Sequence, residues 1–255
     1  MFLLHNWNVN FIYMELALNL TKLRGTIFTS QIFYSPAFVA SLSEVLKNYL
    51  PSFLSILPQN NVAPNVIPNG IVPNFWEMVS TETGERIQFN NIKVDIIKNI
   101  DIPYSTEIIT DFSRHCSDVF NVICSVLGQD STRLAIAPTF TCVDSDENIK
   151  LFAQEIFVKK SFKDSRLDNC IFNNIFRVNE KIGDKKYIVN YLANIYAANR
   201  MEIVNGSNTI KETISVDFDI NTIVDPTYIF DVKAIMDFFA SAPSLCSDYF
   251  NFFFK

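Results

Sequence analysis

Two helical segments set between extended runs constrain the fold of this chain more than any other feature. The first begins at Ser35-Pro36, where serine can cap the helix and proline takes its first position. The second runs from Ser105 to Gly128, with a capping serine at its start and a glycine at its end. Its apolar residues recur at helical spacing: Ile108, Phe112, Cys116, Val119, Ile123 and Leu127.

Extended runs are predicted over residues 26–34, 75–80, 86–97 and 133–143. Pro138 marks the last of these runs as an edge strand or as the site of a bulge. The order is therefore strand, helix, strand, strand, helix, strand, which is typical of a ferredoxin-like fold. We expect a ferredoxin-like β-α-β-β-α-β half in an α+β protein. Many unrelated functions use that fold, so the order by itself indicates no activity.

Residues 144–255 are predicted to form an α-β-β-β-α half with an antiparallel meander. Turns are expected at Gly183-Asp184 and at Asn205-Gly206, the strongest short-range hairpin signal in the chain. A C-terminal helical segment is expected after Asp225-Pro226, with a break at Pro243. The pattern leaves open whether the meander extends the first sheet or forms a second one.

The chain divides into three predicted segments that we expect to form one compact unit. Residues 1–24 form an N-terminal strand extension, with an alternating pattern over 10–21. Residues 25–143 form the ferredoxin-like half, and residues 144–255 form the meander half. The proline-rich stretch 58–74 is longer than a usual connection, which predicts a partner-binding flap or an extended strap over the core.

The composition favours a globular protein. Of the 255 residues, 49% are hydrophobic and only 19% are charged, so the chain can bury enough apolar surface to fold. The 24 phenylalanines predict an aromatic core, an adhesive interface, or both. The formal net charge of -6 argues against a surface built throughout to bind nucleic acid, although it leaves room for a local basic groove.

The sequence favours a cytoplasmic location and predicts no membrane partner. Residues 1–20 have neither the basic start nor the small-residue cleavage site of a secretion signal. No apolar stretch is long enough to span a bilayer. The five cysteines are odd in number and contain no Cys-x-x-Cys pair, which favours reduced thiols.

Few residues suited to catalysis are present. His5 and His115 are the two histidines of the chain, which excludes histidine-rich metal sites. His115 precedes Cys116, but helical spacing turns the two side chains apart, so we expect a boundary histidine beside a core thiol. The six glycines form no Gly-x-Gly or Gly-Lys-Ser cluster, which excludes a glycine-rich phosphate loop. These absences favour a non-enzymatic protein without a cofactor.

Asp217 and Asp219 are the clearest candidates for chemistry. They alternate with apolar residues over 214–221, which predicts a strand with both carboxylates on its outer face. Residues two apart on a strand lie about 7 Å apart, close enough to share a Mg²⁺ or Mn²⁺ ion. The pair is compatible with a metal-dependent phosphodiesterase or nuclease-like enzyme. A metal site needs further ligands that the sequence does not place, so a solvated face, or carboxylates paired with lysine or arginine, is the favoured interpretation.

Aromatic side chains raise two further hypotheses. Several lie on the meander with an arginine and could stack RNA bases, although the Lys/Arg-Gly-Phe/Tyr pattern of RNA-recognition motifs is missing: Phe172, Phe176, Arg177, Tyr187, Tyr191 and Tyr196. Others lie near the C-terminus, where three consecutive phenylalanines cannot all face one core. This tail is predicted to dock on the fold or to bind a partner: Tyr249, Phe250, Phe252, Phe253 and Phe254.

Several short blocks resemble a sporadically distributed bacterial family of unknown function. Residues 75–84 contain its tryptophan, strand, serine and acidic-glycine turn, and the strand at 87–89 follows. Residues 133–136 match its arginine-led strand, with Leu134 where the family has glycine. Residues 216–222 match its Asp-x-Asp strand before a final helix. The resemblance implies the same fold and a link to mobile-element or anti-phage systems.

The sequence as a whole favours a cytosolic binding protein that acts through protein partners or self-association. The missing catalytic residues, the 58–74 stretch and the aromatic tail support this hypothesis, and the resemblance sets it in a bacterial defence or mobile-element system. One alternative is the metal-dependent enzyme centred on Asp217 and Asp219. A second alternative is a single-stranded RNA-binding module.

Overall fold

The computed structural model describes residues 17–30, 32, 36–50, 52–56, 75–142, 171–204 and 207–254. Some predicted features lie outside these residues. They are the cap at Ser35, the strand before residue 17, the 58–74 stretch, the helix after residue 143 and the Asn205-Gly206 turn.

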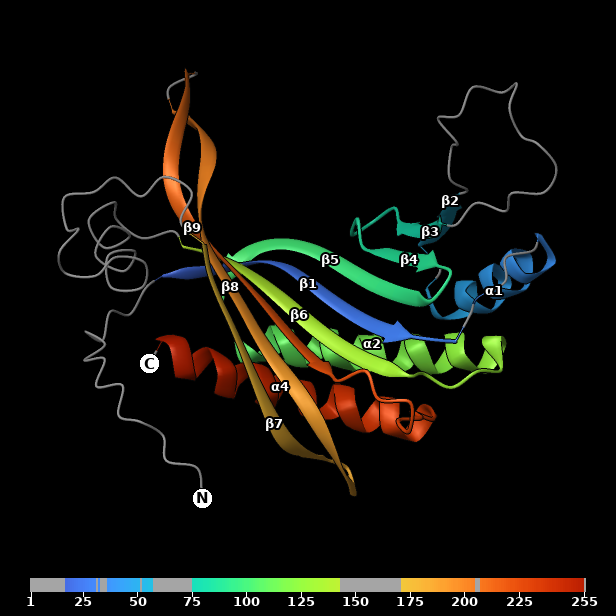
Figure 1. Ribbon diagram of the computed structural model, residues 1–255. Helices are drawn as coiled ribbons and strands as arrows, with labels where there is room; N and C mark the ends of the chain where they lie inside the picture. Colours follow the sequence, from blue (N-terminus) through green and yellow to red (C-terminus); the bar gives the residue numbers. More distant parts are fainter. Residues whose placement is uncertain are drawn as a thin grey trace, which may run out of the picture.

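One antiparallel sheet contains all of the described strands (Figure 1). In chain order they are β1 (Leu18–Phe28), β2 (Phe53–Ile56), β3 (Phe75–Ser80), β4 (Arg86–Asn90), β5 (Lys93–Pro103), β6 (Arg133–Cys142), β7 (Ile171–Ile182), β8 (Lys185–Val204) and β9 (Ser207–Thr222). Their order across the nine-stranded sheet is β2-β3-β4-β5-β1-β6-β9-β8-β7. β1 therefore lies at the centre, and β2 and β7 form the two edges.

The predicted ferredoxin-like β-α-β-β-α-β arrangement is wrong. Four strands, β2 to β5, lie between the first two helices, where the prediction had two. Residues expected to extend the first helix form β2, and the expected single strand over 86–97 is divided into β4 and β5. The Asn90 side chain makes the dividing turn, because its Oδ1 accepts hydrogen bonds from the backbone N–H groups of Ile92 and Lys93 at 3.0 and 2.9 Å.

The C-terminal strands extend this same sheet, because β9 pairs with β6 in the antiparallel sense. β8 and β7 continue from β9 to the edge. β1 itself runs across the expected boundary between residues 24 and 25. The chain therefore forms a single large antiparallel sheet with helices, in place of a ferredoxin-like half and an added meander.

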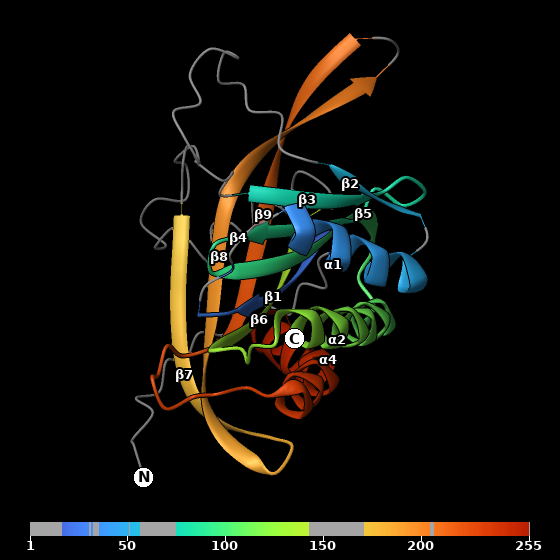
Figure 2. The ribbon, with the colours of Figure 1, turned by 90° about the vertical axis from the view of Figure 1, so that its right-hand side faces the viewer.

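The helices α1 (Pro36–Tyr49), α2 (Thr106–Leu127) and α4 (Val232–Phe254) lie on one side of the sheet, with α2 beside α4 (Figure 2). The predicted ends of α2 are confirmed. Ser105 Oγ accepts a hydrogen bond from the Glu107 N–H at 3.2 Å, and Gly128 ends the helix in the left-handed conformation. Within the described part of the chain, no helix has the length and apolarity needed to cross a bilayer.

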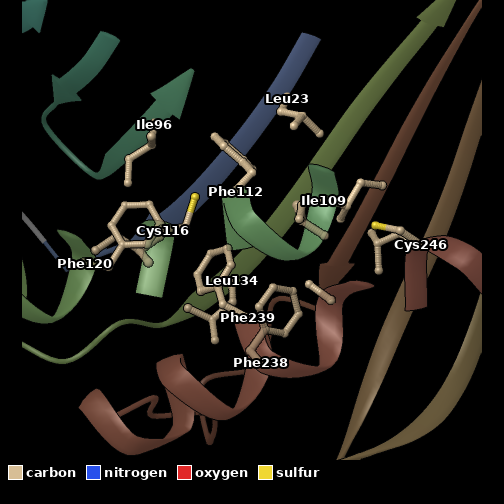
Figure 3. Packing of buried hydrophobic residues seen from close by; sticks show 14 of the residues in the cluster. Leu23, Ile96, Ile109, Phe112, Cys116, Phe120, Leu134, Phe238, Phe239 and Cys246 are labelled. Carbon is tan, nitrogen blue, oxygen red and sulfur yellow. The ribbon is translucent and has the colours of Figure 1, made fainter. Parts of the chain in front are cut away.

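The core lies between the sheet and the three helices, and Figure 3 shows its part under α2 and α4. It is rich in aromatic side chains, and the rings of Phe120 and Phe239 lie 5.3 Å apart between the two helices. The residues that meet at its centre come from α2, from α4 and from three strands: Ile109, Phe112, Cys116, Phe120, Phe238, Phe239, Cys246, Leu23, Ile96 and Leu134.

β1 passes through Gly25, where the sequence predicted separate strands over 10–21 and 26–34. The reason is close packing of the helices. A β-carbon at Gly25 would lie 2.5 Å from Cys116 Sγ and 3.3 Å from a ring carbon of Phe239. Glycine thus lets α2 and α4 approach the centre of the sheet.

Two prolines lie inside regular elements that they were predicted to interrupt. α4 is continuous through Pro243, and the burial of Ala242, Leu245 and Cys246 offsets the cost of about 3 kcal/mol for an interior helix proline. Pro138 lies in β6, a central strand between β1 and β9. β6 pairs with β9 on both sides of Pro138 but not at it, because proline has no N–H to donate.

Candidate functional site

The sheet face turned away from α2 and α4, which we call the polar face, carries both predicted carboxylates. The ring of Phe218 lies 4.6 Å from that of Tyr249 on α4. Asp217 and Asp219 flank Phe218 in β9 and therefore point the other way. Arg24 in β1 also points to the polar face, because the next residue, Gly25, faces the helices. The prediction that the two carboxylates share the face opposite the apolar residues is confirmed.

A polar network crosses this face from β1 to β7. Arg24 Nη2 lies 4.0 Å from Asp219 Oδ2, and Asn221 Nδ2 donates a hydrogen bond to Asp219 Oδ1 at 2.9 Å. Asn190 Nδ2 donates to Asn221 Oδ1 at 3.0 Å. Arg177 Nε donates to Asn190 Oδ1 at 3.2 Å. The carboxylate of Asp219 is thus matched by an arginine charge and an amide.

Small side chains on β6 let the network pass over that strand. Ala137 lies opposite Arg24 in the β1–β6 pairing. Ala135 lies opposite Thr26 on one side and opposite Asn221 on the other. A larger residue at Ala137 would stand between Arg24 and β9. The ion pair across β6 therefore depends on alanine at this position.

Asp217 lies two residues from Asp219 but outside the network. It is opposite Thr139 in β6 and Asn194 in β8. Within the described residues, no group of three or more His, Cys, Asp or Glu side chains gathers around a metal position. A divalent ion at Asp219 would compete with Arg24, so the geometry favours a paired carboxylate there. Metal binding by Asp217 and Asp219 stays a prediction.

His115 pairs with Glu85 and not with Cys116. Its Nε2 lies 2.5 Å from Oε1 of Glu85, which immediately precedes β4. Cys116 is buried beneath β1, and this burial, with a smaller contribution from the charge of Glu85, raises the pKa of its thiol well above the ordinary value. A thiol that stays protonated is a poor nucleophile. The geometry thus provides no cysteine nucleophile at this position.

Most of the predicted aromatic tail lies inside the fold. The tail belongs to α4, which continues to Phe254. One ring, Phe252, is 62% exposed, and its centroid lies 5.2 Å from that of Phe176 in β7. The consecutive phenylalanines are thus divided between the core and one exposed position. The other tail residues are buried or packed against the core: Tyr249, Phe250, Phe253 and Phe254.

The aromatic residues considered for RNA stacking do not share an accessible face. Tyr187 and Tyr191 are buried. The Tyr191 hydroxyl donates to Glu180 Oε1 at 2.6 Å, and burial, together with this contact, raises the pKa of Tyr191. Arg177 points to the polar face, away from these rings. In this conformation bases cannot stack on Tyr187 or Tyr191.

Exposed apolar side chains gather along β7. No described strand pairs with the outer side of β7, so its outer N–H and C=O groups have no partner among the described strands. Apolar exposure on a free strand edge is a feature that folded proteins usually avoid unless the edge binds something. We call five residues the β7 edge surface: Ile171 (67% exposed), Ile175 (59%), Phe176 (36%), Val178 (43%) and Phe252.

Sequence reasoning missed this surface and most of the polar network. The available signal for the surface was the run 171–178, which has apolar residues at both alternating positions and hence on both strand faces. Arg24 and Asp219 meet only across β6, so their contact depends on the strand order.

A comparison with models of known protein families and with curated protein sequences finds no match to this chain. Function is therefore inferred from the chain's own geometry.

Proposed function

We propose that this chain is a binding protein that associates with a protein partner, or with a second copy of itself, through the β7 edge surface. The observation that carries the proposal is a strand edge with which no described strand pairs and which has exposed apolar side chains on both of its faces. Ile175 lies on the polar face, and Val178 and Phe252 lie on the other. Contiguous exposed apolar side chains mark interaction sites, and a free edge can pair with an incoming strand.

The C-terminal helix supports this surface in two ways. Its buried aromatic residues fix α4 against the sheet, and its exposed Phe252 packs edge-on against Phe176. The partner-binding role predicted for the whole tail is therefore assigned to Phe252. The resemblance to the uncharacterised bacterial family adds the proposal that such binding serves a defence or mobile-element system.

The double variant Ile175→Asp/Phe252→Ser tests the proposal. Sedimentation velocity over a wide range of protein concentrations measures self-association. Affinity capture from a bacterial lysate, with each protein as bait, measures partner binding. We expect the wild-type chain to self-associate or to retain specific proteins, and we expect the double variant to lose that property because its edge is polar.

Ile92→Asp/Ile102→Ser is the matched control. Both isoleucines are exposed, Ile92 in the turn before β5 and Ile102 in β5, which is far from β7 in the strand order. Circular dichroism confirms that each variant is folded. The proposal would be overturned if the wild-type chain is a monomer in sedimentation and captures the same proteins from the lysate as the Ile175→Asp/Phe252→Ser variant does.

A further inference from the structure

The free edge of β7 presents backbone hydrogen-bonding groups at alternate residues. Asn179 lies opposite Ile188 in the β7–β8 pairing. The Ile188 N–H donates to the Tyr228 hydroxyl at 3.0 Å, and the Ile188 carbonyl accepts from the Ile223 N–H at 3.1 Å. Both backbone groups of Ile188 therefore point away from β7. In an antiparallel pair the opposite residue also turns its groups outward, so Asn179 and the residues two before and two after it face the free edge.

The polar-face side of this edge is positively charged. Arg177 and Lys181 lie on the polar face of β7, and Lys186 of β8 lies directly opposite Lys181. All three side chains are exposed. Within the described part of the chain, no ion pair joins any of them to a carboxylate. Like charges on opposite residues repel, so a negative charge placed here would be stabilised.

The other face of the same edge is apolar. Phe176 and Val178 lie there, and Phe252 extends from α4 to the ring of Phe176. Glu180, the carboxylate on this face, accepts the hydrogen bond of the Tyr191 hydroxyl. Over residues 176–181, a strand added to β7 would therefore meet cations on one face and hydrophobic side chains on the other, and beyond Arg177 the polar face continues with the exposed Ile175.

We propose that β7 accepts a strand from an acidic partner protein in which acidic and apolar residues alternate. The acidic side chains lie on the polar face against Arg177 and Lys181. The apolar side chains pack on Phe176, Val178 and Phe252. Backbone hydrogen bonds hold the strand at the edge, and the alternation provides specificity. This inference rests on the proposed function and adds the chemistry of the partner and its mode of binding.

The same charges disfavour a second copy as the occupant. If two copies paired their β7 strands in the antiparallel sense, opposite residues would project to the same face of the joined sheet. The polar face of one copy would then adjoin the polar face of the other. In the registers that pair most of the strand, Arg177 lies opposite or diagonal to the partner's Arg177. Cross-strand like charges are destabilising, whereas an acidic strand meets no such repulsion.

The test uses a short fluorescent peptide in which glutamate alternates with valine, and a second peptide with lysine in place of glutamate. Fluorescence anisotropy measures their binding to the full chain. We expect the glutamate peptide to bind in a salt-sensitive manner. Lys181→Glu/Lys186→Glu weakens that binding by about tenfold or more and favours the lysine peptide. Asn179→Pro weakens it similarly, because proline removes an outward N–H at an edge position that tolerates proline.

Lys47→Glu/Arg114→Glu is the matched control, because it makes the same change in net charge on the exposed surfaces of α1 and α2. It should bind the glutamate peptide as the wild type does. No binding, or binding that Lys181→Glu/Lys186→Glu leaves unchanged, overturns the inference. Association that still depends on Ile175 and Phe252 would then leave the proposed function standing. A dimer in sedimentation that Asn179→Pro abolishes also overturns the inference, because the occupant is then a second copy.

Discussion

Gly25 and Cys116 are packed so closely that a β-carbon on the glycine would lie 2.5 Å from the cysteine sulfur. Gly25→Ala should therefore lower the free energy of unfolding by about 1–3 kcal/mol, the usual cost of overpacking a core. Urea unfolding measures the loss. In Gly25→Ala/Cys116→Ala the loss should be smaller than the sum of the two single variants, because removing the sulfur makes room. Strict additivity would show that the two residues do not compete for space.

Asn221 sits between Asn190 and Asp219 in the polar network and is fully buried. Asn221→Asp places a second carboxylate beside Asp219 and should cost about 1–3 kcal/mol of stability at neutral pH. Protonation of either carboxylate removes the repulsion, so the penalty should fade in acid. Chemical unfolding at neutral and acidic pH checks this, with the exposed Asn99→Asp as control. An equal loss at both pH values contradicts it.

The neighbouring residues Phe252 and Phe253 differ sharply in burial, with 62% and 7% of their surfaces exposed. Phe253→Ala should destabilise the fold by about 3–5 kcal/mol, because it leaves a cavity between α4 and the sheet. Phe252→Ala should cost less than about 1 kcal/mol. Thermal or urea unfolding of the two variants compares them directly. If the two variants lose similar amounts of unfolding free energy, the two rings do not differ in burial as described.

Asp95 is buried and receives a hydrogen bond from Thr26 Oγ1 and an ion pair from Lys93 Nζ, each at 2.6 Å. Lys93→Met leaves the carboxylate without its cation and should cost about 1–3 kcal/mol. Lys93→Met/Asp95→Asn should recover part of that loss, because no buried charge remains. Urea unfolding of the two proteins decides, and a double variant less stable than Lys93→Met would contradict the account.

Cys124 is buried at the end of α2, and this burial, with a smaller effect of Asp130, raises the pKa of its thiol to about 11. In the unfolded chain a cysteine thiol ionises near pH ~8.5. Above that pH the unfolded state loses its proton first, so stability should fall as the pH rises toward 11, by up to about 3 kcal/mol from this group. In Cys124→Ala, the free energy of unfolding measured with urea should fall less steeply as the pH rises above about 8.5. A slope equal to that of the wild type would exclude this contribution.

Local signals predicted the elements whose ends are set by nearby residues. Ser105 and Gly128 bound α2, and both caps form as the sequence indicates. The run over β6 was also predicted as a strand, because its apolar alternation does not depend on what lies beside it. The shared face of Asp217 and Asp219 follows from the same two-residue period.

Features that depend on distant packing could not be predicted. Gly25 has the sequence signature of a break, but its missing side chain admits the helices at the middle of a strand. Pro243 is held in α4 by the burial of its neighbours. The partner of Asp219 is Arg24, which is two strands away across the sheet and in a remote part of the sequence. No local period encodes such a contact.

The position of β9 between β6 and β8 gives the chain a particular order of assembly. A ribosome makes β1 to β8 first, and until β9 emerges one side of β6 lacks its neighbour and the β7–β8 hairpin has no place in the sheet. Closing this gap requires pairings between distant residues such as Ala135 and Asn221, which are slow to form. A nascent chain that stopped before β9 would thus expose the middle of its sheet as an adhesive edge. Once β9 has been translated, it can pair with β6 and cover this edge.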